Sequence, residues 1–258
     1  MAPAGRPAGR PGRRWQYGTT VEIMTGAGPA HVDFDRPENG RAAFLAVLTH
    51  GAGGTPDTRD VLAVRDVARA RHAATALVTQ PYRVKGARAP GSAARQDEAW
   101  IEIIGALREA APGVPLIQGG RSNGARVVCR TAADVGAAGV IALAFPLHPP
   151  GQPDKSRDAE LRRAGTSVLV VNGDRDPFGV PEPDPTTRVV VIAGETHALA
   201  KHPEAIGAAV AEWLDGLSGL LLSGCYYYQV RRLEPDGQSG DAARSSRHSV
   251  AALRCPRI

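Results

Sequence analysis

Three polar residues with the chemistry needed for acyl transfer each follow an apolar segment of the chain. Ser122 follows the first of these segments, Asp176 the second and His197 the third. A serine hydroxyl becomes a strong nucleophile when an imidazole takes its proton, and a carboxylate must hold that imidazole in the right tautomer. The three residue types therefore predict a hydrolytic site, provided that the fold brings the ends of these segments together.

The surroundings of Ser122 add a more specific signal. Gly-Arg-Ser-Asn-Gly at 120–124 matches the Gly-x-Ser-x-Gly pattern, in which a serine sits on a tight turn between a strand and a helix. A helix that begins near Asn123 would aim its N-terminal N–H groups at the reaction centre. Because glycine and serine are common, this pattern has meaning only together with a base, an acid and an oxyanion site.

The elements that must position these residues alternate along the chain. Continuous apolar runs are typical of strands covered on both faces of a parallel sheet, and such runs occupy 43–49, 74–79, 139–145 and 166–172, with a further strand at 187–192. Amphipathic helices are predicted at 58–72, 93–111 and 203–217. This order predicts an α/β fold with a doubly wound, mostly parallel sheet and helices on both faces. An antiparallel hairpin at 20–34 is expected to form its edge.

A glycine-rich loop follows the predicted strand at 43–49. The sequence His-Gly-Ala-Gly-Gly at 50–54 lacks the Gly-Lys-Ser/Thr of a phosphate-binding P-loop and the spacing of a dinucleotide fingerprint. The alternative is a loop that presents a backbone N–H group to a developing oxyanion, and this alternative is favoured. His50 itself is expected to brace the loop rather than to react.

Composition sets the limits of the folded part. The net charge of +5 comes largely from arginines near the two ends of the chain. Residues 1–14 are rich in Pro, Gly and Arg, and residues 218–258 have no usable period, so both segments are predicted to be disordered, with one folded domain at 15–217. Aromatic residues make up only 5% of the chain, which argues against a nucleic-acid partner.

Several other classes of protein are also disfavoured. No apolar run is long enough for a membrane span, the first residues lack the apolar core of a secretory signal, and the three cysteines do not form a disulfide framework. A cytoplasmic protein is therefore expected. No Cys or His spacing is typical of a metal site, so neither a metal nor a cofactor is predicted. The sequence makes no prediction of oligomeric state.

In this combination of motifs the chain resembles the α/β-hydrolase family. Within that family it is similar to the small, lid-less branch of dienelactone-hydrolase-like and testis-expressed hydrolase-like proteins. The resemblance covers about residues 15–217 and rests on the segments 50–54, 119–126, 145–151, 173–179 and 194–197. The short interval between Phe145 and Val168 leaves little chain for a lid.

The resemblance implies a role for each motif. Ser122 would be the nucleophile, Asp176 the orienting acid and His197 the base. The backbone N–H groups of Asn123 and Ala52 would hold the oxyanion. Residues expected to line the pocket are His50, Arg121, His148 and Phe178.

Two alternatives compete with these roles. Asp174 could replace Asp176, although the spacing from Gly173 and the following Pro-Phe-Gly favour Asp176. His148 could replace His197, but it precedes the acid, against the order of the family, and is expected to be structural or to line the pocket.

The resemblance implies a serine hydrolase that acts on a small ester, a lactone or a related acyl substrate through an acyl-enzyme. Asn123, Arg121 and Arg126 make the serine turn polar, which favours a small polar or acidic ester over a long acyl chain. The two arginines would either meet an acidic substrate or pair with nearby carboxylates, and the sequence leaves both open. A catalytically inactive scaffold for protein complexes is the alternative function.

Overall fold

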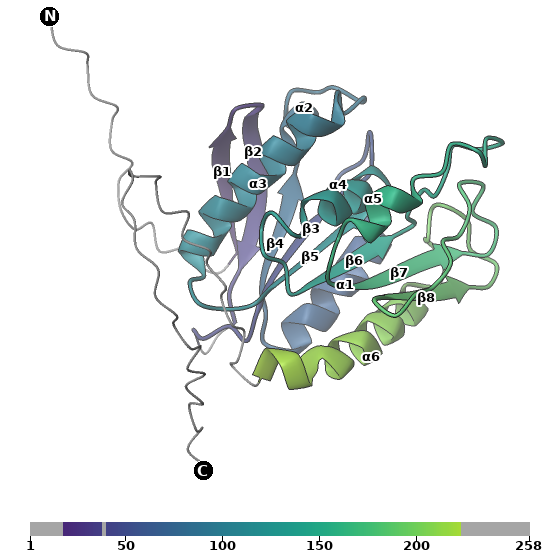
Figure 1. Ribbon diagram of the computed structural model, residues 1–258. Coiled ribbons are helices and arrows are strands. Elements are labelled where there is room, and N and C mark those ends of the chain that lie inside the picture. Colours follow the sequence, from purple (N-terminus) through teal and green to yellow (C-terminus); the bar gives the residue numbers. More distant parts are fainter. Residues whose placement is uncertain (1–17, 38–39, 223–258) are drawn as a thin grey trace, which may run out of the picture. The chain divides into compact units, whose positions relative to one another are not determined.

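A computed structural model describes residues 18–37 and 40–222. Eight strands form one sheet in the order β1-β2-β4-β3-β5-β6-β7-β8 (Figure 1). The strands are β1 (Thr19–Thr25), β2 (Gly28–Asp35), β3 (Leu45–Thr49), β4 (Ala74–Thr79), β5 (Leu116–Arg121), β6 (Gly139–Leu143), β7 (Ser167–Gly173) and β8 (Thr187–Ile192). The helices are α1 (Arg59–Ala70), α2 (Pro81–Val84), α3 (Ala93–Ala110), α4 (Asn123–Thr131), α5 (Asp158–Arg162) and α6 (Pro203–Leu222).

The sheet is parallel from β4 to β8 and antiparallel only at the β1–β2 side. Both β3 and β6 are buried along their whole length, as their continuous apolar sequences predict. The hairpin β1–β2 alternates between buried and exposed side chains, and β2 continues the sheet by pairing antiparallel with β4. The predicted α/β class and mostly parallel sheet are confirmed.

Helices cover both faces of the sheet. Helices α3, α4 and α5 lie on one face, and α1 and α6 lie on the other (Figure 1). On the first face Trp100, Ile103 and Leu107 of α3 are almost fully buried. On the second face Ile206 and Val210 of α6 are buried to the same degree. Each amphipathic helix thus buries its apolar stripe against the sheet, which is the main source of stability in such a layered fold.

The structure departs from the sequence prediction in a few places. Helix α6 continues to Leu222, whereas the sequence predicts an end at 217. The short helix α2 occupies a segment for which the sequence analysis predicts no element, and on α3 Ile101 is exposed while Ile103 is buried. The predicted disordered segment 1–14 and the part of the predicted tail beyond Leu222 lie outside the described residues, so the domain limits stay predictions.

The functional loops lie where the parallel strands end. The carboxyl ends of β3, β5, β7 and β8 lead into the segments that contain the glycine loop, Ser122, Asp176 and His197. Between β6 and β7 the only helix is α5, so no large lid is built there. In an open α/β sheet, ligands bind at the carboxyl ends of the strands, so this edge is the candidate site.

Candidate active site

Ser122 occupies a strained turn between β5 and α4. Its φ is +52° and its ψ is −112°, a conformation that L residues other than glycine rarely adopt. A Cβ added at Gly120 would lie 2.4 Å from the carbonyl carbon of Gly124, and one added at Gly124 would lie 2.5 Å from the carbonyl oxygen of His50. Both glycines are therefore required by close backbone contacts, which hold the strand, the turn and the helix together.

A chain of hydrogen bonds links Ser122 to His197 and Asp176. The distance from His197 Nε2 to Ser122 Oγ is 2.8 Å, and the distance from His197 Nδ1 to Asp176 Oδ2 is 2.9 Å. Because a carboxylate can only accept, the proton on the imidazole belongs on Nδ1, which leaves Nε2 free to accept from the serine hydroxyl. This is the arrangement that general-base activation of a serine needs.

The Asp176 carboxylate is held from two sides. Its side chain is fully buried, and its Oδ1 accepts a 2.9 Å hydrogen bond from the backbone N–H of Phe178. The Phe178 ring lies against His197, with 4.3 Å between the ring centroids. On the other side, the amide of Asn172 donates to the carbonyl oxygens of Phe145 and Gly179 and fixes the loop that carries the acid.

The loop that carries His197 is organised by the buried carboxylate of Glu195. This carboxylate accepts hydrogen bonds from the backbone N–H groups of Ala200, Lys201 and His202. Burial by itself would raise the pKa of Glu195, but the three N–H groups outweigh burial and lower it. A Cβ added at Gly173 would lie 2.3 Å from the Glu195 carbonyl oxygen, so the loop also packs directly on the end of β7.

Two backbone N–H groups beside Ser122 are free to bind an oxyanion. Within residues 40–222, the N–H groups of Ala52 and Asn123 donate to no protein acceptor. The glycine loop lies against the serine, because a Cβ added at Gly51 would be 3.1 Å from Ser122 Cβ. Preorganised N–H donors of this kind stabilise the negative charge of a tetrahedral intermediate.

His50 is buried and its ring contacts the backbone on both sides, at the glycine loop and at the end of β4. Its Nδ1 lies 2.8 Å from the carbonyl oxygen of Gly51, and its Nε2 accepts a 3.0 Å hydrogen bond from the Gln80 N–H. Burial lowers the pKa of His50, which keeps the ring neutral and able to make both contacts. The sequence interpretation of His50 as a brace agrees with this geometry.

The two competing residues are engaged elsewhere. Asp174 Oδ1 accepts a 2.8 Å hydrogen bond from the Gly194 N–H, as a turn residue would. His148 is half-buried, and its Nδ1 lies 2.9 Å from the carbonyl oxygen of Pro149. Its ring also lies beside Gly179, where a Cβ would come within 2.5 Å of Nε2. The structure thus brings Asp176 and His197, rather than Asp174 and His148, to Ser122.

Comparison with known proteins agrees with this geometry. A family model described as an alpha/beta hydrolase domain matches residues 42–202, which is more than half of the chain. The chain belongs to the α/β-hydrolase family. No curated protein matches it by sequence.

Solved structures show the same fold at low sequence identity. An alpha-beta serine hydrolase homologue from Coxiella burnetii has 18% identity and a TM-score of 0.64, and the match covers 78% of this chain and 99% of that one. A serine hydrolase without lid from Xanthomonas campestris has 20% identity and a TM-score of 0.59, covering 76% and 95%. Dienelactone hydrolase from Anabaena variabilis has 16% identity and a TM-score of 0.61, covering 77% and 96%. The resemblance to lid-less and dienelactone-hydrolase-like proteins is confirmed at the level of the fold, and the testis-expressed sub-branch stays a prediction.

Both arginines of the serine turn in this α/β-hydrolase pair with carboxylates. Arg121 Nε lies 3.0 Å from Asp60 Oδ2, and Arg126 makes two hydrogen bonds of 2.7 and 2.8 Å to Glu160. The sequence left open whether these arginines meet an acidic substrate or pair with carboxylates, and in the structure they pair with carboxylates. Neither arginine is a free cation for an acidic substrate.

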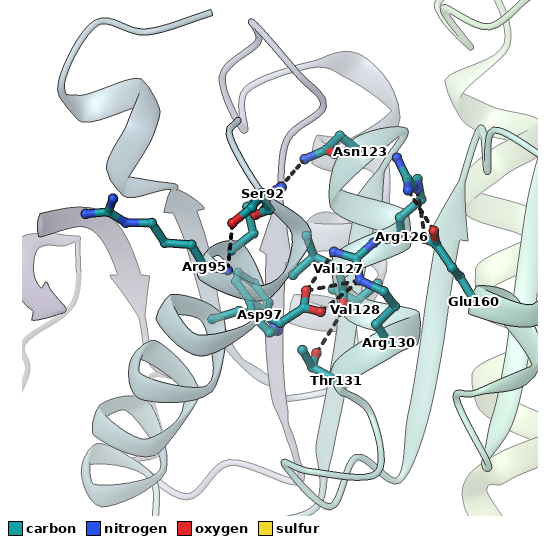
Figure 2. Close-up of polar contacts among 12 residues, drawn as sticks. Ser92, Arg95, Asp97, Asn123, Arg126, Val127, Val128, Arg130, Thr131 and Glu160 are labelled. Carbon is teal, nitrogen blue, oxygen red and sulfur yellow. Dashed lines mark hydrogen bonds and ion pairs between the residues drawn. The ribbon is translucent and has the colours of Figure 1, made fainter. Parts of the chain in front are cut away.

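A cavity of about 230 Å³ in this hydrolase is lined by Ala27 of the β1–β2 turn, by residues of and after α2, and by residues of α3. Its lining includes neither Ser122 nor the predicted pocket residues His50, Arg121, His148 and Phe178. Its lining includes Gln80, Tyr82 of α2, Gln96 of α3, and the cations Lys85 and Arg95. The side-chain amide of Asn123 donates a 2.7 Å hydrogen bond to Gln96 Oε1, so the residue after Ser122 contacts a residue of the cavity lining (Figure 2). Burial raises the pKa of Tyr82 to about 12, which keeps its hydroxyl neutral.

The charged residues of this cavity are of one sign. Among the lining residues in the described part of the chain there is no Asp or Glu. Lys85 Nζ donates to the carbonyl oxygen of Ala27, and the Arg95 side chain points away from the ion pairs of α4 (Figure 2). Neither cation has a carboxylate partner within residues 18–37 and 40–222. The cavity is therefore suited to a ligand with a negatively charged end.

Sequence reasoning missed four residues that shape the site. Asp60, Gln96, Asn172 and Glu195 each hold a functional segment through contacts described above. Only Glu195 carries a local signal, because it lies two residues before His197 in a loop. The partners of Asp60 and Gln96 are distant in sequence and could be found only from the fold.

The described residues give no sign of two further kinds of site. Within them, no group of three or more His, Cys, Asp or Glu side chains is placed to hold a metal ion. No helix of the same residues has the length and apolar character needed to cross a membrane.

Proposed function

We propose that the protein is a serine hydrolase that cleaves a small ester, a lactone or a related acyl compound. The observation that carries this proposal is the hydrogen-bonded sequence Ser122–His197–Asp176, at 2.8 and 2.9 Å, on a strained turn. A non-glycine residue at φ +52° costs stability, and such strain persists where the rest of the fold enforces it, most often at functional sites.

The first half-reaction forms an acyl-enzyme. Ser122 Oγ attacks the carbonyl carbon while its proton passes to His197 Nε2, and the imidazolium is stabilised by the carboxylate of Asp176. The carbonyl oxygen becomes an oxyanion that accepts hydrogen bonds from the N–H groups of Ala52 and Asn123. The intermediate then collapses, the bond to the leaving alcohol breaks, and the proton on His197 moves to that alcohol.

The second half-reaction restores the enzyme. His197 takes a proton from a water molecule, and the oxygen of that water attacks the acyl carbon. The bond to Ser122 Oγ breaks as His197 returns a proton to it, which releases the carboxylic acid. In a lactone the alcohol and the acid belong to one molecule, so one product leaves.

The substrate we propose is small and carries a polar or acidic group. Gln96 and Gln80 link the cavity of about 230 Å³ to Asn123 and to His50, and this cavity has room for a short acyl or alcohol group. Lys85 and Arg95 at this cavity, rather than Arg121 and Arg126, supply positive charge for an acidic end. Among similar structures, Est1E from Butyrivibrio proteoclasticus is described with ferulic acid bound, at 16% identity and a TM-score of 0.61, which agrees with a site for small carboxylic acids.

A fluorophosphonate probe tests the mechanism directly. The parent protein should be labelled at Ser122, and Ser122→Ala should abolish labelling and the hydrolysis of p-nitrophenyl acetate. Ser156→Ala is the matched control, because Ser156 is an exposed serine on a surface loop. Circular dichroism must show that all three proteins are folded. A folded parent that is not labelled would contradict the enzyme and leave the scaffold alternative.

A further inference from the structure

Arg121 is the residue immediately before Ser122, and it touches three different parts of the site. Its Nη2 donates a 2.8 Å hydrogen bond to the backbone carbonyl oxygen of His197. Its Nε lies 3.0 Å from Oδ2 of Asp60, in the first turn of α1. Its Nη1 lies against the glycine loop, since a Cβ added at Gly51 would be only 3.2 Å from it.

These contacts cross a wide part of the fold. Arg121 ends β5, whereas His197 follows β8, and β6 and β7 lie between these two strands in the sheet. The side chain of His197 bonds to Ser122 and Asp176, but those bonds do not fix the backbone from which the ring extends. The guanidinium group holds that backbone directly, and it does so from the residue adjacent to the nucleophile.

Asp60 holds the guanidinium group in turn. The Asp60 side chain is 1% exposed and that of Arg121 is 18% exposed, so water cannot replace either partner easily. The Arg121 Nε and Asp60 Oδ2 atoms are close enough for an ion pair, but they are not aligned as a hydrogen bond. A buried ion pair contributes little net stability compared with apolar residues, so its presence favours a role in fixing structure.

We propose that Arg121, held by Asp60, is a positioning residue for the hydrolytic reaction: it fixes the backbone at His197 and the glycine loop at Gly51 relative to Ser122. This inference rests on the proposed function. Arg121 acts through His197 and the loop and does not touch the substrate. The planar guanidinium group is required, because a lysine ammonium cannot face Asp60, the His197 carbonyl and Gly51 at once.

The test compares Arg121→Gln and Arg121→Lys with the parent, using p-nitrophenyl acetate and a fluorophosphonate probe. Both variants should lower kcat and the rate of labelling by about ten- to a hundredfold, the range expected when a charge-assisted hydrogen bond is lost, with little change in KM. Arg126→Gln is the matched control: this arginine also flanks Ser122 and pairs with a carboxylate but does not contact the loop of His197. It should keep the parental kcat.

Removal of Arg121 alone leaves Asp60 as an unpaired buried charge, which can prevent folding. The double variant Arg121→Gln/Asp60→Asn removes both charges and keeps the test valid. It should fold and remain as slow as the single variant, and the pH profile of its kcat/KM should shift because the environment of His197 has changed. A merely structural role would lower the melting temperature without moving this profile.

The outcomes separate the two proposals. If the parent is labelled and folded Arg121→Gln, or the double variant, reacts at the parental rate, the positioning role is wrong and the serine hydrolase stands. A rise in KM that occurs only with carboxylate-bearing esters would instead assign Arg121 to the substrate and also overturn this inference. If the folded parent is neither labelled nor active, the proposed function itself fails.

Discussion

The two faces of the sheet use buried charge differently. On the face covered by α3, α4 and α5, Arg126 and Arg130 join Asp97 and Glu160 into one network, with Arg130 only 7% exposed between two carboxylates (Figure 2). On the face covered by α1 and α6, the buried Asp60 pairs with Arg121.

The partners on each face explain the difference. The network connects helix to helix. Burial raises the pKa of Glu160, but the hydrogen bonds and charges of Arg126 and Arg130 outweigh burial and lower it. The pair connects the end of a strand to α1 and, through Arg121, to the His197 loop. We therefore expect the network to determine how stable the helical layer is, and the pair to determine how well the site is aligned.

The largest effect that bears on this comparison is expected at Arg130. Arg130→Gln leaves Asp97 and Glu160 half-buried with a lost partner, and should lower the free energy of unfolding by about 2 kcal/mol, between the costs for exposed and fully buried pairs. Urea denaturation measures this loss. The kcat of the folded variant should equal that of the parent. A fall in kcat without a loss of stability would show that this face also aligns the site.

Acid pH separates Glu195 from Glu160, whose pKa values are both lowered in the folded state. In the unfolded chain a glutamate has a pKa of about 4.3, so as the pH falls the unfolded chain takes up a proton before the folded protein does. The stabilisation by each of these carboxylates is therefore complete above that pH and is lost as the pH falls toward the lower pKa of the folded state. Melting temperatures from pH 7 to 3 should therefore fall less steeply in Glu195→Gln and Glu160→Gln than in the parent. Only Glu195→Gln should also lower kcat at pH 7, because Glu195 holds the His197 loop.

The two cations of the cavity should affect selectivity rather than stability. Lys85→Gln/Arg95→Gln is expected to raise KM about tenfold for an ester with a free carboxylate, by loss of charge-assisted contacts at an exposed site. Hydrolysis of a neutral ester of the same size should be unchanged. Steady-state kinetics on the two esters gives the comparison, and equal effects on both would remove the argument for an acidic substrate.

The smallest effect is expected at an exposed pair on the α1–α6 face. Arg71 makes two hydrogen bonds to Asp215, which is 63% exposed. Arg71→Gln should change the free energy of unfolding by less than about 1 kcal/mol because water screens such pairs. Thermal melting in low and high salt checks this. A loss of stability as large as that of Arg130→Gln would show that the contribution of an ion pair to stability does not depend on its burial in this protein.

The fold was predictable where the signal is periodic and local. The continuous apolar residues of β3 and β6 predict buried strands. Ser122, Asp176 and His197 each follow a parallel strand, so the sequence could place them at one edge of the sheet. Ile101 and Ile103 show the limit, because both are apolar and only the rotation of α3 on the sheet decides which is buried. Helix α2 was missed because a single turn after Gln80 has too few residues to show a period.

The site was predictable only in its reacting groups. The residues that hold those groups, such as Asp60 and Gln96, act across 61 and 27 positions of sequence, and no local pattern relates them to Arg121 or Asn123. Their roles depend on which loops meet at the sheet edge. The sequence indicated that Arg121 would meet either an acidic substrate or a carboxylate. Only the position of α1, which carries Asp60, decides between the two.

The turn at Ser122 has a consequence for how the protein would evolve. A glycine would adopt φ +52° without the strain that a side chain adds, which for such conformations is about 1–3 kcal/mol. Selection for heat resistance alone would therefore favour glycine at this position, at the loss of the hydroxyl. A population under selection for hydrolysis must keep the less stable residue, so the frequency of glycine at 122 after laboratory evolution would report which pressure the protein had experienced.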